Sequence, residues 1–293
     1  MNVQFLAESV ALAAFYAIVG AGFVLIYRSS RIVNLAHGDL MMLGGYLAFA
    51  FVPLFPPALA WGGLLLALIG SFVLGYALYF LIMRPLIGQP VVAALMVTIG
   101  VSSMLEGLAT LIWTPQTQLL AVTLNIANDP HRLWSGVVLS TYDLATIVCA
   151  VIYVGAIIVF LKFSRVGVQM RAAAENPILA SQRGINVFSI FALTWSIAIL
   201  GATMAGVLFG GNNRLAPDIG VVGLTAMTVP LVGGMDSMWG LIPASLMVAL
   251  AEHAVSTYID PALSDIIPMA IMLLVLIARP WGLFGTKEEI QRV

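Results

Sequence analysis

Long apolar runs recur along the whole chain, and most are long enough to cross a membrane. Hydropathy places them at residues 6–27, 33–52, 58–83, 91–113, 138–161, 188–211, 219–234, 237–257 and 262–279. An α-helix needs about 20 residues to cross roughly 30 Å of hydrocarbon, whereas barrel strands alternate over about ten residues. Residues 148–161 do not alternate. The pattern therefore predicts an all-α, polytopic bundle of eight to ten transmembrane helices.

Two of these runs look interrupted. The run 33–52 begins with the polar residues Asn34, His37 and Asp39, and the run 219–234 is short and rich in glycine. Non-helical backbone at membrane depth is tolerated only against protein or water, so we expect broken or re-entrant segments here. They follow the first and the sixth run, which suggests a duplicated unit, although the two halves are too dissimilar in sequence to assert a repeat.

Composition supports a membrane protein. The chain is 61% hydrophobic and 9% charged, whereas soluble domains carry about 25% charged residues. No polar segment is long enough to build its own core, so we expect one transmembrane domain over residues 1–293. The first run ends in Arg28 and Arg31 instead of a cleavage site, which indicates a retained span. A net charge of −1 gives no reason to expect nucleic-acid binding, and the single Cys149 excludes an intrachain disulfide.

The basic residues predict the orientation. Of 12 Lys and Arg residues, all except Arg132 and Arg214 fall on one side of the predicted spans. Basic residues in short loops mark the cytoplasmic side. This side also holds Lys287 and Arg292, so the C-terminus is expected in the cytoplasm.

The main polar interruption is the basic segment 162–187. Asn176 can cap a helix whose first residue is Pro177, and Gly184 can end it. The pattern predicts a short helix over 177–183, preceded by a helical stretch over 169–175. Small residues at Ala172, Ala173, Ala174 and Ala180 favour a helix pair docked on the bundle or on a partner, and a solvated connecting loop is the alternative.

Glu106 is the clearest charged residue inside a span. Ser102, Ser103 and Thr110 lie about one turn away on its helix. A mid-membrane carboxylate costs about 2.5–3.5 kcal/mol on insertion scales, so it needs water or a partner. A wet transport path and a carboxyl buried against another helix both remain open.

Asn34 and His37 can satisfy backbone groups at a broken helix or contact a substrate, and the structural role is preferred. His37 and Asp39 are two residues apart, without further ligands nearby, so no metal site is expected.

Several blocks, taken together and in order, resemble one transporter family. Ser164–Gly167, Arg171–Ala172, Ala174–Asn176 and Gly184–Asn186 are similar to the cytoplasmic coupling segment of LivH-type branched-chain amino acid permeases of bacterial ATP-binding-cassette importers. Further agreement covers nearly the whole chain and comes from Asn34–Gly38, Gly44, Tyr46, Ala205–Val207, Val232–Gly234, Ser237, Ala251–Glu252 and Arg279–Gly285. Three features depart from the family pattern and put the exact substrate in doubt: Glu106, Asp236 and the segment Tyr27–Ser30, which adds a second basic residue to a turn that is usually smaller.

The resemblance implies a permease subunit of the bacterial inner membrane, with no cofactor of its own. Two partner subunits would bind ATP and Mg²⁺, a second permease subunit (a LivM-like paralogue or another copy) would complete the path, and a periplasmic binding protein would deliver substrate. Leucine, isoleucine or valine is the expected substrate, and relatives carry urea, short amides or other small solutes. The implied ATPase-coupling residues are Arg165, Gly167, Arg171, Ala174, Glu175, Asn176, Pro177, Arg183 and Gly184. The candidate pathway residues are Asn34, His37, Ser102, Ser103 and Glu106.

Other function classes have weaker support. The chain lacks the G-x-x-x-x-G-K-[ST] nucleotide loop and any motif for hydrolytic catalysis, which argues against an enzyme. A stand-alone carrier that uses Glu106 as its ion site is the competing hypothesis. Dependence on an ATPase partner separates the two.

Overall fold

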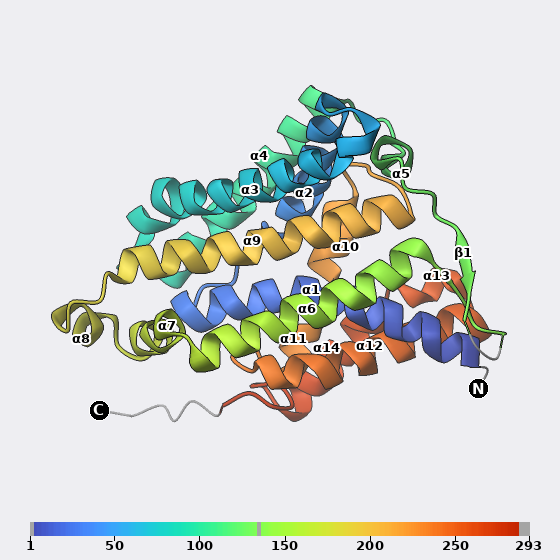
Figure 1. The fold of residues 1–293 in the computed structure, drawn as a ribbon. Helices are drawn as coiled ribbons and strands as arrows, with labels where there is room; N and C mark the ends of the chain where they lie inside the picture. Colours follow the sequence, from blue (N-terminus) through green and yellow to red (C-terminus); the bar gives the residue numbers. More distant parts are fainter. Residues whose placement is uncertain (1–2, 134–135, 287–293) are drawn as a thin grey trace.

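The computed structural model describes residues 3–133 and 136–286, and these residues form a bundle of long helices (Figure 1). Eight helical stretches in this part of the chain are long and apolar enough to span a membrane, which agrees with the predicted count of eight to ten. The α-helices are α1 (Val3–Ser30), α2 (His37–Phe51), α3 (Ala60–Leu78), α4 (Val91–Trp113), α5 (Leu120–Leu124), α6 (Thr141–Phe163), α7 (Arg165–Glu175), α8 (Pro177–Gln182), α9 (Val187–Asn212), α10 (Ile219–Thr225), α11 (Thr228–Gly233), α12 (Met238–Tyr258), α13 (Pro261–Ser264) and α14 (Ile267–Ala278).

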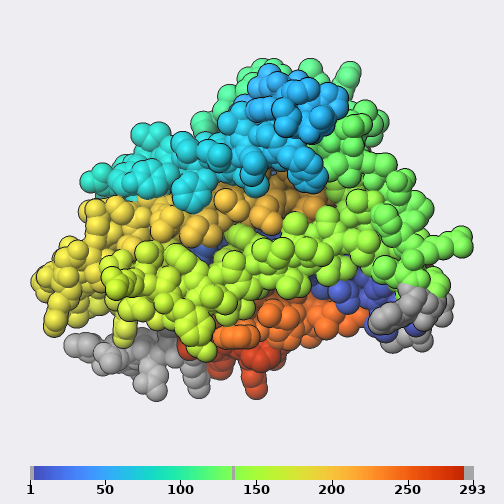
Figure 2. Space-filling view, viewed as in Figure 1, coloured from blue at the N-terminus to red at the C-terminus, as the bar shows by residue number. Residues whose placement is uncertain are grey.

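Helices α1 and α9 form the centre of the bundle. They pack on each other and run in opposite directions (Figure 1). Helices α6 and α12 cover α1, whereas α2 and α3 cover α9. Figure 2 accordingly shows α1 at the surface mainly near its N-terminal end. Both central helices are apolar around most of their circumference, which is expected of helices buried on all sides.

The expected broken segments are present. Helix α2 begins only at His37, after a non-helical stretch that follows α1, and the run 219–234 is divided into α10 and α11. The two segments touch through glycines: a Cβ added to Gly223 would lie only 2.6 Å from the Cα of Gly38. Helices α2 and α10 thus meet inside the bundle, with backbone against backbone.

The packing has the pattern of an inverted repeat. In this repeat α1 corresponds to α9, α2 to α10–α11, α3 to α12, and α4 to α14. The contact α1–α12 then corresponds to α9–α3, the contact α2–α3 to α11–α12, and the contact α2–α4 to α11–α14. All six of these helix pairs pack against each other. Since α1 and α9 are antiparallel (Figure 1), the two units have opposite directions. This arrangement supports the duplicated unit that the sequence suggested, and it is common among transporters.

The predicted all-α bundle is confirmed, and two helix starts differ from the sequence expectations. Residues 138–140 belong to strand β2 (Val138–Ser140), which pairs antiparallel with β1 (Pro130–Arg132), so α6 starts at Thr141 instead of residue 138. The Gln4 side chain holds β2 by bonding both the N–H and the carbonyl of Val138. Helix α7 starts at Arg165 instead of residue 169, because Ser164 caps it.

The two ends of the bundle differ in character. One end carries the β1–β2 hairpin, and the other, which we call the α8 end, carries α7, α8 and the C-terminal part of α1 (Figure 1). The segment Arg279–Gly285 folds back against the segment Val232–Gly234. The N–H groups of Leu283 and Phe284 donate to the carbonyls of Val232 and Gly233 at 2.8 and 3.0 Å. Lys287 and Arg292, part of the predicted basic side, lie outside the described residues.

Candidate coupling segment and transport pathway

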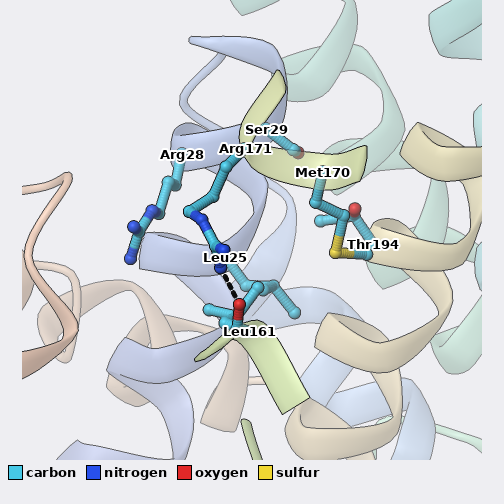
Figure 3. Close-up of a pocket in the computed structure, with 7 residues that line it drawn as sticks. All are labelled: Leu25, Arg28, Ser29, Leu161, Met170, Arg171 and Thr194. Atoms are coloured by element: carbon cyan, nitrogen blue, oxygen red, sulfur yellow. Dashed lines mark hydrogen bonds between the residues drawn. The ribbon is translucent and has the colours of Figure 1, made fainter. Parts of the chain in front are cut away.

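Helix α7 is fastened to the end of α6. The Ser164 hydroxyl accepts a hydrogen bond from the N–H of Gly167 at 2.8 Å, which caps α7. A side chain at Gly167 would collide with the backbone of Phe160 and Leu161, so only glycine permits this close approach. The Arg171 guanidinium donates to the carbonyl of Leu161 (Figure 3). This bond satisfies a carbonyl in the last turn of α6, where intrahelical partners run out.

Helix α8 has the predicted signals at both of its ends. The Asn176 side chain accepts from the N–H of Leu179 at 3.0 Å, Pro177 is the first helical residue, and Gly184 takes the left-handed conformation with φ of 80°. Ala180 is buried against α7 and α9, but Ile178 and Leu179 are 71% and 56% exposed. A short, capped helix thus presents apolar side chains at the tip of the α8 end.

The other predicted coupling residues surround this tip. Arg165, Glu175 and Arg183 are exposed, whereas Ala174 and Arg171 are half-buried. Arg171 and Gly167 anchor α7 to the end of α6 through contacts within this chain. Contact of any of these residues with an ATPase stays a prediction.

Asn34 and His37 occupy the packed interior. Asn34 is 1% exposed, and its side-chain oxygen accepts from the N–H of Ala36 at 3.1 Å, which stabilises the turn before α2 as the structural role requires. His37 is 0% exposed and lies edge-on to Phe23, with ring centroids 4.5 Å apart. Substrate contact by either residue stays a prediction.

Two of the three predicted pathway residues of α4 lie on its outward side. Ser103 and Glu106 are exposed, and Ser102 is half-buried. The Glu106 carboxylate has no hydrogen bond or ion pair within the described part of the chain. An unpaired carboxylate on a membrane helix requires a partner or water outside this chain.

Asp39 joins this group, although no pathway role was predicted for it. The Ser102 hydroxyl donates to the Asp39 carboxylate at 2.5 Å, and Asp39 also interacts electrostatically with Glu106. Asp39 and Ser102 are far apart in the sequence, and only the packing of α2 on α4 brings them together. The result is an acidic, hydroxyl-bearing face beside the point where α2 and α10 meet.

A second polar group, near the hairpin end, ties α12 to α1. The Tyr16 hydroxyl donates to Glu252 at 2.6 Å, and Glu8 contacts His253 at 2.9 Å. These contacts join residues that are far apart in the sequence. Within the described residues, no three or more His, Cys, Asp or Glu side chains come together in a way that could hold a metal ion.

Eight apolar helical stretches, an inverted arrangement of broken helices and an exposed helix pair at one end together define a multi-pass membrane transport protein. Residues 5–276 match the family described as the permease component of branched-chain amino acid transport systems, and the chain belongs to this family. Its role is that of a permease, a transport subunit rather than an enzyme.

Named relatives are similar over almost their full length. The permease LivH of Escherichia coli K12, from a high-affinity branched-chain amino acid transport system, is 28% identical over 98% of this chain and 96% of its own. BraD of Pseudomonas aeruginosa is 27% identical over 99% and 97%, and a probable LivH of Methanocaldococcus jannaschii is 22% identical over 94% and 90%. No solved structure gave a significant match.

Proposed function

We propose that this chain is an inner-membrane permease subunit of a bacterial ATP-binding-cassette importer for branched-chain amino acids. The relatives named above carry this substrate class in their names. The α8 end faces the cytoplasm in this proposal, because basic residues concentrate there. The hairpin end then faces the binding protein that delivers substrate.

The observation that carries the proposal is the exposed α8 held on an anchored α7. A two-turn helix has little stability alone, so its cap, its contacts with α7 and α9 and the Arg171 anchor make it a rigid projection. Its apolar residues Ile178 and Leu179 would enter a groove on an ATPase subunit. Closure of two such subunits around ATP and Mg²⁺ would then move α7 and the end of α6 as one unit.

The face formed by Asp39, Ser102, Ser103 and Glu106 would line the transport path. It lies open in the single chain, so a second permease subunit, either a paralogue or another copy, would close the path from the opposite side. An amino acid carries an ammonium group, and carboxylates at this depth can offset the cost of removing that charge from water.

Reconstitution of the chain with its co-purified subunits in liposomes tests this proposal. We expect two ATPase subunits and a second permease to remain bound in native mass spectrometry, and leucine uptake to require ATP and the binding protein. Uptake by the chain alone, driven by an ion gradient, would instead establish the carrier built on Glu106. ATP-dependent uptake of urea or an amide, without leucine uptake, would keep the importer and change its substrate.

A further inference from the structure

A basic cavity lies at the α8 end, between α6 and α12. Its volume is about 240 Å³, and its lining comes from four helices: Arg28 of α1, Ile158, Leu161 and Lys162 of α6, Arg171 of α7, and Met238 and Trp239 of α12. A smaller void of about 10 Å³, enough for one water molecule, adjoins it and shares Arg28, Leu161 and Arg171 (Figure 3). The cavity is therefore a junction of the central helix, the α6–α7 corner and the start of α12.

The described part of the chain does not neutralise the three cationic side chains of this cavity. Within the described residues, Arg28, Lys162 and Arg171 form no ion pair. Figure 3 shows Arg28 and Arg171 side by side, with their guanidinium groups extending in the same direction. Two adjacent guanidinium groups repel each other, and an anion between them would remove this repulsion.

Nearby acids among the described residues offset this positive charge only in part. Asp236 interacts with Arg28 electrostatically, but its carboxylate accepts hydrogen bonds from the backbone N–H and the hydroxyl of Thr286. Glu175 lies one turn from Arg171 on α7 and is exposed. One carboxylate thus faces three cations, and the charge that the described residues place around the cavity remains positive.

Apolar surface continues from the cavity along both flanking helices. On α6, Ile158 is followed on the same face by Gly155, beside which there is open space, and by Val151 and Val148, which are 69% and 56% exposed. On α12, Trp239, Ile242 and Leu246 form a matching stripe and are 67%, 47% and 40% exposed. Residues spaced by three or four lie on one helix face.

We propose that this cavity binds the phosphate headgroup of an anionic phospholipid, whose acyl chains lie along the α6 and α12 stripes. Basic clefts between membrane helices on the cytoplasmic side recognise such headgroups, and tryptophan favours the membrane interface. A free phosphate would use the cations but not the apolar stripes, whereas a lipid uses both. The bound headgroup joins α1, α6 and α7, so it also fixes the root of the proposed coupling segment.

Lipid titration of the full-length chain, followed by native mass spectrometry, tests this site. We expect phosphatidylglycerol to bind at least tenfold more tightly than phosphatidylcholine. Each basic side chain near a membrane surface contributes about fivefold to such binding, so the variant R28Q/K162Q should lose about 25-fold in phosphatidylglycerol affinity. Lys162→Gln alone should lose about fivefold in phosphatidylglycerol affinity. Because Lys162 is exposed, this single variant should fold normally and keeps the test valid if the double variant misfolds.

Arg84→Gln is the matched control. This residue is also basic, but it stacks on Phe80 and Phe188, away from the cavity. It should retain the affinity of the unchanged chain for phosphatidylglycerol. Equal binding of both lipids, or unchanged binding by R28Q/K162Q, would overturn the proposal.

Two competition experiments identify the ligand. Millimolar inorganic phosphate should leave phosphatidylglycerol bound, and complete displacement would assign the site to a free anion. Addition of the ATPase subunits should also leave the lipid bound. Loss of the lipid on assembly would assign the three cations to acidic residues of the partner and overturn the lipid site.

Discussion

At the residue scale, individual glycines and one carboxylate decide how the bundle can work. Gly38 and Gly223 let α2 and α10 approach until their backbones touch, and Gly167 does the same for α6 and α7. Glu106, in contrast, is held by nothing within the described residues, although it stands on a membrane helix. The glycines therefore serve packing, and Glu106 is free for a contact outside the chain.

Gly223→Ala should destabilise the protein. The added Cβ would lie 2.6 Å from the Cα of Gly38, and backbone atoms on both sides cannot move away easily. Overpacking of this kind costs about 1–3 kcal/mol, so the midpoint of thermal aggregation in detergent should fall by several degrees. Gly100→Ala is the control, because nothing lies within 4 Å of a Cβ there, and alanine favours a helix over glycine. Equal midpoints for the two variants would contradict the tight α2–α10 contact.

Glu106→Gln should leave folding intact and change transport. The amide keeps the size of the side chain and removes its charge, so a substrate ammonium group in the proposed path would lose an attraction. We expect a change of about tenfold in uptake rate or apparent KM, equivalent to 1.4 kcal/mol, with substrate preference altered across an amino-acid panel. Unchanged kinetics for every substrate would reduce Glu106 to a structural residue.

At the element scale, the ends of helices carry the proposed mechanism. Ser164, Asn176 and Gly184 define where α7 and α8 begin and end, and Arg171 attaches α7 to the last turn of α6. These local signals convert a polar segment of 162–187 into two short helices with fixed directions. A segment without them would be a loop that could not transmit movement.

Asn176→Ala should loosen α8 and uncouple ATP hydrolysis from transport. Loss of an N-cap costs about 1 kcal/mol, which is a large share of the stability of a two-turn helix. Hydrogen exchange over residues 177–183 should become faster, and ATP-driven uptake by the reconstituted complex should fall. Asn176→Asp keeps a capping oxygen and should restore both. Normal uptake and exchange in Asn176→Ala would contradict the role of the cap.

At the scale of the whole molecule, two units of opposite direction share a centre made of α1 and α9. The broken segment of each unit reaches that centre, so α2 and α10 meet there. The polar groups of Asp39 and Ser102 lie next to this junction. The proposed path would lie beside two broken helices, so small movements of either unit would change access to it.

Cysteine labelling in intact cells tests the orientation. In a Cys149→Ala background, Arg132→Cys places a thiol on the hairpin and Arg183→Cys places one at the α8 end; both positions are exposed. A membrane-impermeant reagent should label Arg132→Cys directly and Arg183→Cys only after permeabilisation. The reverse pattern would place the α8 end outside the cell and exclude its contact with an ATPase.

Features that depend on neighbours along the chain could be predicted from the amino-acid sequence. Hydropathy placed the spans, and the cap at Asn176, the stop at Gly184 and the two interrupted runs were found where expected. Each of these follows from interactions within a few residues, which composition and spacing reveal.

Which of these elements meet could be seen only in the folded protein. It placed Ser102 against Asp39, Gly38 against Gly223 and Tyr16 against Glu252, and it showed that Arg171 holds the end of α6. The hairpin of residues 130–140 was also missed, because its pairing and the Gln4 bond to Val138 join distant parts of the chain. Such contacts depend on how whole helices pack, and in a chain that is apolar nearly everywhere, hydropathy does not distinguish a face that meets protein from one that meets lipid.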